Sequence, residues 1–160
     1  MDNFSQDRYC GADGGAMQTG DKFKLTVTRR FNAAAEAVFD AWLDPVGAPK
    51  WLFATPNGEM LRADIDPSVG GEFCIVEKRE DEVMEHLGEY TVIDRPRRLA
   101  FMFTVNMSDD VSHVTVDIAP VAGGSELTLN HEMGAQWTAY GDRTIAGWEM
   151  ILDGLAATLA

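Results

Sequence analysis

The last 23 residues carry the clearest pattern of apolar and polar positions in the chain. Within residues 138–160, large apolar side chains recur at alternating steps of three and four, at Ile145, Trp148, Leu152, Leu155 and Leu159. At about 100° per residue, these steps place the side chains on one stripe of an α-helix. Acidic residues fall on the opposite side. The pattern predicts one long amphipathic helix that closes over an apolar surface built by the preceding chain.

Most of the chain before this helix alternates with a period of two, which is typical of strands with one buried face. A first strand is predicted over residues 22–31. Short turns separate six further predicted strands, at residues 59–66, 72–78, 84–93, 99–105, 112–120 and 126–133. Gly88 interrupts one of them and is a candidate bulge or bend. Strands joined by such short turns become antiparallel neighbours.

Two short helices are predicted between the first and second strands. The first covers residues 33–43 with Asn32 as its cap, and the second runs from about residue 45 to residue 52. A sheet of about seven antiparallel strands curls by its natural twist. We therefore predict an α+β helix-grip fold over residues 22–160, with the long C-terminal helix in the concave face and the short helices at one end. The glycine-rich residues 1–21 are predicted to be a flexible N-terminal tail.

Composition narrows the class of protein. The chain has 160 residues, 46% of them hydrophobic, which suffices for one domain with a real core. The net charge of −13 argues against binding to nucleic acid or to anionic membranes. No apolar run is long enough to span a bilayer, and the N-terminus does not read as a secretory signal, so we expect a cytoplasmic protein. Two cysteines and three histidines at unrelated spacings predict neither a disulfide framework nor a metal site, and we expect no cofactor.

Several phrases, taken in order, resemble a known family. They are FKLTVTRRFNAAAEAVFDAWLDP, KWLF, DIDPSVGGEF, GEYTVIDRPRRLAFMF, SHVTVDIAP, GGSELTLNHE and GWEMILDGL. The ordered set, over about residues 22–160, resembles the START-like or SRPBCC superfamily, whose helix-grip fold is that of the birch pollen allergen. Within it, the chain is most similar to homologues of the activator of heat-shock-protein ATPase. The superfamily includes lipid carriers, hormone receptors, polyketide cyclases and co-chaperone domains, so the function must be argued from the site.

Strand parity, together with one aromatic residue from each of two helices, predicts the lining of a ligand cavity. The candidate ligand-binding residues are Trp51, Phe73, His86, Tyr90, Phe101, Phe103, His131 and Trp148. A mostly apolar, aromatic lining with two imidazoles and a phenol is typical of a small-molecule site. The alternative is that these aromatic residues only form the core.

His86 and His131 are the candidates for hydrogen bonding to a ligand or for acid–base catalysis in this cavity, because an imidazole can orient a carbonyl or act as an acid or base. The alternative, which a single histidine on a strand favours, is a hydrogen-bonded histidine of the core or its rim. His113 has the opposite parity and is predicted to face solvent. Gly147 and Gly154, seven residues apart on the long helix, either make room for a ligand or allow close packing. The sequence shows no catalytic motif.

The leading functional hypothesis is therefore binding of a hydrophobic or aromatic small molecule in an internal cavity. One alternative is an enzyme of the polyketide cyclase or hydrolase type that uses a cavity histidine. Another is a co-chaperone-like interaction module, although no motif points to a chaperone partner. Formation of a homodimer through a sheet face or edge stays open.

Overall fold

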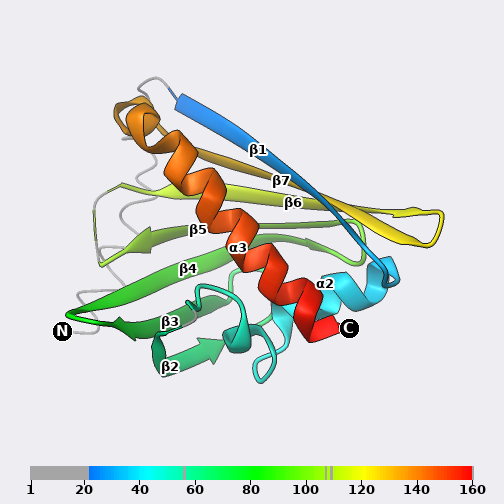
Figure 1. Ribbon diagram of the computed structural model, residues 1–160, viewed down its shortest axis with the longest axis horizontal. Coiled ribbons are helices and arrows are strands. Elements are labelled where there is room, and N and C mark those ends of the chain that lie inside the picture. Colours follow the sequence, from blue (N-terminus) through cyan, green and yellow to red (C-terminus); the bar gives the residue numbers. More distant parts are fainter. Residues whose placement is uncertain (1–21, 56, 107, 109, 160) are drawn as a thin grey trace.

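A single curved sheet and the long helix that lies across it dominate the structure. The computed structural model describes residues 22–55, 57–106, 108 and 110–159. The sheet has seven strands in the order β1-β7-β6-β5-β4-β3-β2, and helix α3 crosses its face (Figure 1). This confirms the predicted α+β helix-grip architecture. The predicted tail, residues 1–21, lies outside the described residues.

Every pair of neighbouring strands is antiparallel. The strands are β1 (Lys22–Phe31), β2 (Glu59–Ile65), β3 (Glu72–Arg79), β4 (Glu82–Asp94), β5 (Arg98–Val105), β6 (Ser112–Val121) and β7 (Gly124–Gly134). From β2 to β7, each strand pairs with the next along the chain, and β1 returns to pair with β7 over its whole length. Burial alternates strictly along β7, so one face of the sheet forms the core.

The first helix is confirmed, but the second is shorter than predicted. Helix α2 spans Ala35–Leu43, and Ala34 rather than Asn32 is its N-cap, with no side-chain cap. The second predicted helix is only a single 3₁₀ turn, η2 (Ala48–Lys50). Pro49 lies inside this turn and has no backbone N–H to donate, which disfavours a longer helix there.

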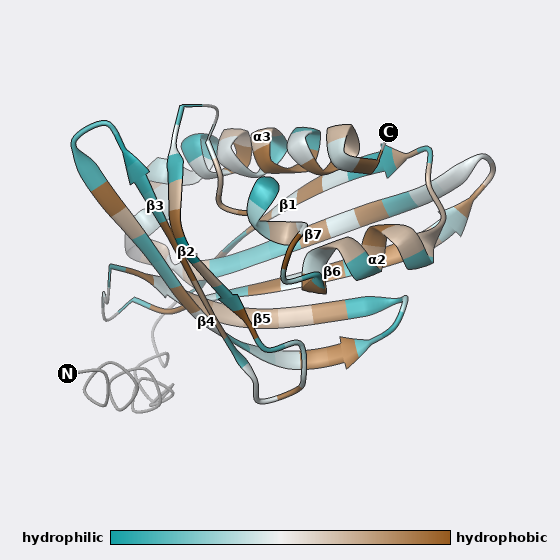
Figure 2. Ribbon diagram, turned by 90° about the horizontal axis from the view of Figure 1, so that it is seen from below, coloured by the Kyte–Doolittle hydropathy of each residue, from teal (hydrophilic) through white to brown (hydrophobic). Residues whose placement is uncertain are grey.

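The C-terminal helix begins later than its apolar pattern predicts. Helix α3 spans Gly141–Leu159, and the residues before it form a 3₁₀ helix, η3 (Ala135–Tyr140). The predicted stripe faces the core, with Trp148, Leu152 and Leu155 buried. Seen from below, α3 and α2 lie on the same side of the curved sheet (Figure 2). No helix among the residues that the structure describes is long and apolar enough to cross a membrane.

Gly88 is neither a bulge nor a bend. It pairs regularly with Phe73 on β3 and with Phe103 on β5, and the irregularity in β4 lies between Tyr90 and Val92. The glycine serves packing instead, because a Cβ built on it would lie 2.1 Å from the ring of Phe73. The missing side chain at this position leaves the space that the ring of Phe73 occupies.

We predict that Gly88→Ala destabilises the protein by about 1–3 kcal/mol, because the added methyl group overpacks the core. Gly147→Ala is the matched control. A Cβ at Gly147 meets nothing within 4 Å, and alanine is favoured over glycine in a helix by about 1 kcal/mol. Urea denaturation should therefore show a lower free energy of unfolding for the first variant and an unchanged or higher one for the second. Equal stability of Gly88→Ala and wild type would contradict this account of Gly88.

Candidate functional site

The eight predicted site residues all lie in one buried group of rings. None of the eight is more than 5% exposed. Ring-to-ring contacts connect all of them once Trp42 and Phe53 are included. These ten residues are called the aromatic cluster below. The cluster lies between the concave face of the sheet, α2, α3 and the segment that follows η2, residues 51–55.

The register of the sheet explains why these side chains meet. His131 on β7, Val114 on β6, Phe101 on β5 and Tyr90 on β4 pair directly and form one row across the sheet. With about 4.8 Å between neighbouring strands, the ends of this row are about 14 Å apart along the sheet. Two polar aromatic side chains, His131 and Tyr90, thus lie at the ends of an apolar floor.

Trp42 and Phe53 belong to the cluster although the sequence analysis did not place them in the site. The ring of Trp42 packs edge-on against Trp51, with 4.9 Å between centroids. Phe53 stacks on His86, with centroids 4.1 Å apart and planes inclined by 9°. Phe53 has a left-handed backbone, with φ of 56°, a conformation that sequence periodicity cannot indicate. Trp42 could have been found, because it shares one apolar face of the first helix with Val38 and Phe39.

A hydrogen bond between α3 and β7 fixes the proton on His131. The indole Nε1 of Trp148 donates to Nδ1 of His131 over 2.8 Å. An indole N–H can only donate, so Nδ1 carries no proton and the neutral ring carries its proton on Nε2. Burial, and to a smaller extent the nearby His113, lower the pKa of His131 to about 4. Near neutral pH, His131 is therefore a neutral hydrogen-bond donor through Nε2.

His86 is also kept neutral. Burial, and then the positive charge of Arg79, lower its pKa to about 4. The ring lies under Phe53 and is 5% exposed. An acid–base role near neutral pH requires a pKa near the working pH, and neither cluster histidine has one. In this structure, both are suited to hydrogen bonding rather than to proton transfer.

Five polar atoms of the cluster have no hydrogen-bond partner within the described part of the chain. They are Nε1 of Trp42, Nε1 of Trp51, Nδ1 of His86, Oη of Tyr90 and Nε2 of His131. Their side chains are 5% exposed or less. Burial also raises the pKa of Tyr90, so its hydroxyl keeps its proton. A buried polar atom without a partner costs about 1–3 kcal/mol, so this concentration of such atoms is unusual for a core.

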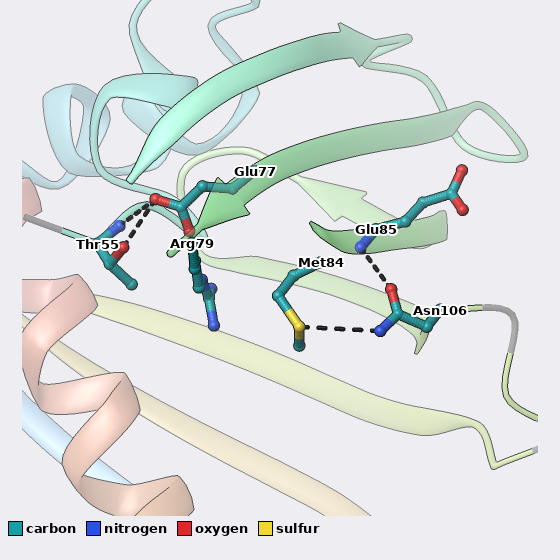
Figure 3. Close-up of polar contacts among 6 residues, drawn as sticks. All are labelled: Thr55, Glu77, Arg79, Met84, Glu85 and Asn106. Carbon is teal, nitrogen blue, oxygen red and sulfur yellow. Dashed lines mark hydrogen bonds and ion pairs between the residues drawn. The ribbon is translucent and has the colours of Figure 1, made fainter. Parts of the chain in front are cut away.

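A buried carboxylate anchors the segment that carries Phe53. Glu77 on β3 is 1% exposed, and its Oε2 accepts hydrogen bonds from the backbone N and the hydroxyl of Thr55, over 2.7 and 2.9 Å. Its Oε1 accepts from Arg79 over 2.5 Å (Figure 3). Burial would raise the pKa of Glu77, but the bonds from Arg79 and Thr55 lower it below its ordinary value. A Cβ on Gly58 would lie 1.8 Å from Oε2, so only glycine fits beside this carboxylate.

Glu77 is a functional residue that strand parity in the sequence could have indicated. Phe73, Ile75 and Glu77 are alternate residues of β3 and share one face of the strand. A charged residue at an inward strand position is rare unless it is paired.

The rim near this carboxylate is open to solvent. A cleft of about 480 Å³ is lined by Thr55, Asn57, Arg79, Glu80, Asp81 and Glu82. Next to it, the Asn106 side chain accepts from the backbone N of Glu85 over 2.8 Å and ties the end of β5 to β4 (Figure 3). The cleft contains none of the cluster residues, so it lies outside the predicted site. Within the described ranges, no group of three or more His, Cys, Asp or Glu residues could hold a metal ion.

The two helix glycines serve different purposes. A Cβ on Gly154 would lie 3.1 Å from Cβ of Trp51, so this glycine lets α3 pack closely against the segment after η2. A Cβ on Gly147 would meet nothing within 4 Å. His113 lies on the outer face of β6 and is half-buried rather than fully exposed.

Comparison with known proteins identifies the family. The model of the family described as Activator of Hsp90 ATPase homolog 1-like protein matches residues 32–160. The chain belongs to this family. The family is part of the SRPBCC or helix-grip superfamily, which confirms the resemblance seen in the sequence, and proteins with this fold commonly bind hydrophobic ligands. A search of curated proteins gives no match.

Solved structures from several bacteria share the fold. A Rhodobacter sphaeroides protein is 24% identical, with a TM-score of 0.76 over 88% of this chain and 94% of that one. An AHSA1-like protein of Aeromonas hydrophila is 24% identical, with a TM-score of 0.70 over 86% and 92% of the two chains. A Staphylococcus aureus protein described as of unknown function is 13% identical, with a TM-score of 0.78 over 88% and 95%. At these identities the likeness shows the fold alone.

We predict that Glu77→Gln lowers the free energy of unfolding at pH 7 by about 1–3 kcal/mol, because the charged hydrogen bonds to Thr55 and Arg79 weaken. The folded-state pKa of Glu77 is lowered, so its contribution is present above the ordinary value of 4.5 and is lost as the pH falls through the folded-state pKa. Urea denaturation should show the gap between variant and wild type closing on acidification. The exposed Glu82, changed to Gln, is the control, and an equal effect of both changes would contradict the assignment.

The two cluster histidines should make stability depend on pH in the same direction. Their folded-state pKa of about 4 lies below the ordinary 6.5, so the unfolded chain takes up protons first as the pH falls. Stability is then complete above pH 6.5 and falls toward pH 4, by up to about 1.4 kcal/mol per pH unit for each histidine. NMR titration should find both imidazoles neutral at pH 5. A midpoint near 6.5 for either would contradict their burial.

Proposed function

We propose that the protein binds a hydrophobic or aromatic small molecule among the rings of the aromatic cluster, between the sheet and α3. One observation carries the proposal: five buried polar atoms of the cluster have no partner among the described residues. Two other buried polar side chains of the described interior are paired. Ser125 donates to the backbone oxygen of Ala33, and both carboxylate oxygens of Glu77 accept hydrogen bonds.

The energetic cost of these atoms supports a binding role. At about 1–3 kcal/mol each, five such atoms together cost an amount comparable to the whole stability of a small domain, about 5–15 kcal/mol. Phe or Leu at the same positions would fill similar space without this cost. Side chains that weaken the free protein are expected where function requires them. A bound molecule that hydrogen bonds to these atoms would offset the cost.

The segment that carries Phe53 offers a route to these atoms. Phe53 covers His86 by stacking and also contacts Phe103 and Trp148. The segment has no regular secondary structure and is held to β3 through the bonds of Thr55 to Glu77. Displacement of this one segment would uncover the His86 side of the cluster while the sheet stays intact.

The other interpretations of the sequence stay predictions. Neither cluster histidine has a pKa suited to acid–base catalysis near neutral pH, so no specific observation favours the enzyme. The family description names an ATPase activator, which raises a chaperone partner for this chain as a hypothesis. The homodimer and the cytoplasmic location also stay predictions.

The four tryptophans provide the test. In the full chain labelled with ¹⁵N-tryptophan, the indole signals of Trp42, Trp51 and Trp148 report on the cluster. Trp137 packs against Tyr140 in η3 and is a built-in control. Titration with fluorene and with 9-fluorenone should shift the three cluster signals with saturation at one molecule per chain and leave Trp137 in place. Neither compound shifting the cluster signals, or both shifting Trp137 alone, would contradict the proposal.

A further inference from the structure

The unpartnered atoms of the aromatic cluster are mostly donors, and this polarity constrains what can bind. The indole Nε1 atoms of Trp42 and Trp51 can only donate. His131 Nε2 can also only donate, because the bond from Trp148 occupies Nδ1 and leaves the proton on Nε2. The hydroxyl of Tyr90 can donate or accept, and so can Nδ1 of His86, depending on its tautomer. Three of the five atoms therefore require an acceptor on the ligand.

The electrostatics of the interior favour a ligand without net charge. Among the residues that the structure describes, Glu77 is the buried acidic side chain and no Lys or Arg is buried. Arg79, the cation nearest to this carboxylate, is paired with it. Burying a charged ligand group without a counter-charge costs several kcal/mol. A carboxylate ligand would find donors but no compensating cation, and an amine would find donors where it needs acceptors.

The shape of the interior favours flat, rigid molecules. Aromatic rings from the sheet, α2 and α3 surround the unpartnered atoms, with centroids between 4.1 and 6.3 Å apart within the cluster. Rings at such distances attract other aromatic rings by stacked or edge-on contact. His131 and Tyr90 lie at opposite ends of one row of the sheet, so a molecule lying along this row could accept hydrogen bonds at either end.

We infer that the ligand is a neutral aromatic ketone or quinone, whose carbonyl oxygens accept hydrogen bonds from His131 Nε2 or from other unpartnered donors of the aromatic cluster. This inference rests on the proposed function and adds the chemical class of the ligand. The Trp148–His131 bond is a positioning device: it sets the tautomer that presents the donor. A carbonyl supplies acceptor lone pairs and no hydrogen, which matches a set in which three members can only donate.

The test is a matched series of compounds bound to the full chain, measured by isothermal titration calorimetry. The three-ring set is 9-fluorenone, fluorene and fluorene-9-carboxylate, and the two-ring pair is 1-indanone and indane. One carbonyl that gains one or two hydrogen bonds should make each ketone bind about tenfold tighter than its hydrocarbon. The carboxylate should bind at least about tenfold more weakly than 9-fluorenone, because its charge is not compensated.

Two variants test which atoms cause the preference for the ketone over the hydrocarbon. Asn at position 131 places an amide oxygen where Nδ1 accepts from Trp148 but does not reach as far as Nε2, so His131→Asn removes the donor and keeps the acceptor. Tyr90→Phe removes only an oxygen that has no partner among the described residues, so it retains the fold. At least one variant should reduce the ratio of 9-fluorenone affinity to fluorene affinity toward one. His113→Asn, on the outer face of β6, should keep the preference.

The outcomes separate this inference from the proposed function. Equal binding of ketone and hydrocarbon leaves the proposed function standing and overturns the ligand class. Tightest binding of the carboxylate overturns the neutral character of the ligand. Preference retained in both His131→Asn and Tyr90→Phe overturns the role of these donors. Binding of none of the five compounds overturns both proposals.

Discussion

The hydrogen bond from Trp148 to His131 is the interaction on which the interior depends. It joins the middle of the gripping helix to a strand near one edge of the sheet, in a place closed to solvent. Without it, two more polar atoms would be buried without partners, at a cost of about 1–3 kcal/mol each. The same bond sets the tautomer of His131, so that Nε2 carries the proton and can donate a hydrogen bond. This contact thus ties the helix to the sheet and determines which nitrogen of His131 can donate.

Around this bond, the carboxylate of Glu77 is fully paired, whereas five polar atoms of the cluster have no partner among the described residues. Glu77 is a charged residue in the core, yet each of its oxygens is bonded, and glycine at position 58 leaves the space that its carboxylate needs. Similarly, the absence of side chains at Gly88 and Gly154 leaves room for Phe73 and Trp51. The polar atoms left over are on aromatic side chains, which can contact a flat molecule and hydrogen bond to it at once. The proposed function therefore rests on one contrast: Glu77 is fully hydrogen-bonded, whereas the five polar atoms of the aromatic cluster are not.

Sequence periodicity predicted most of the fold and much of the cluster, because both follow from which side chains share a face. The seven strands, the long helix and the inward direction of Phe101, Tyr90 and His131 follow from periods of two and 3.6. Periodicity could not locate Phe53, whose left-handed backbone lies in an irregular segment. It also could not explain why position 88 is glycine, because the reason is the ring of Phe73 on the neighbouring strand. The bond between Trp148 and His131 joins elements that are close only in the folded chain. Strand parity could have predicted that Glu77 points inward. Its role in holding the Phe53 segment is visible only with its partners Thr55 and Arg79 in place.

A crystal structure of the full chain soaked with 9-fluorenone tests the central claim most directly. The account predicts the compound inside the aromatic cluster, with its carbonyl oxygen within hydrogen-bond distance of His131 Nε2 or another of the unpartnered donors and with Trp148 still bonded to Nδ1. Ordered water molecules on these atoms, with the compound absent from the interior or bound only in the outer cleft beside Glu82, would contradict it. In that case the five polar atoms would be a hydrated part of the core and not a ligand site.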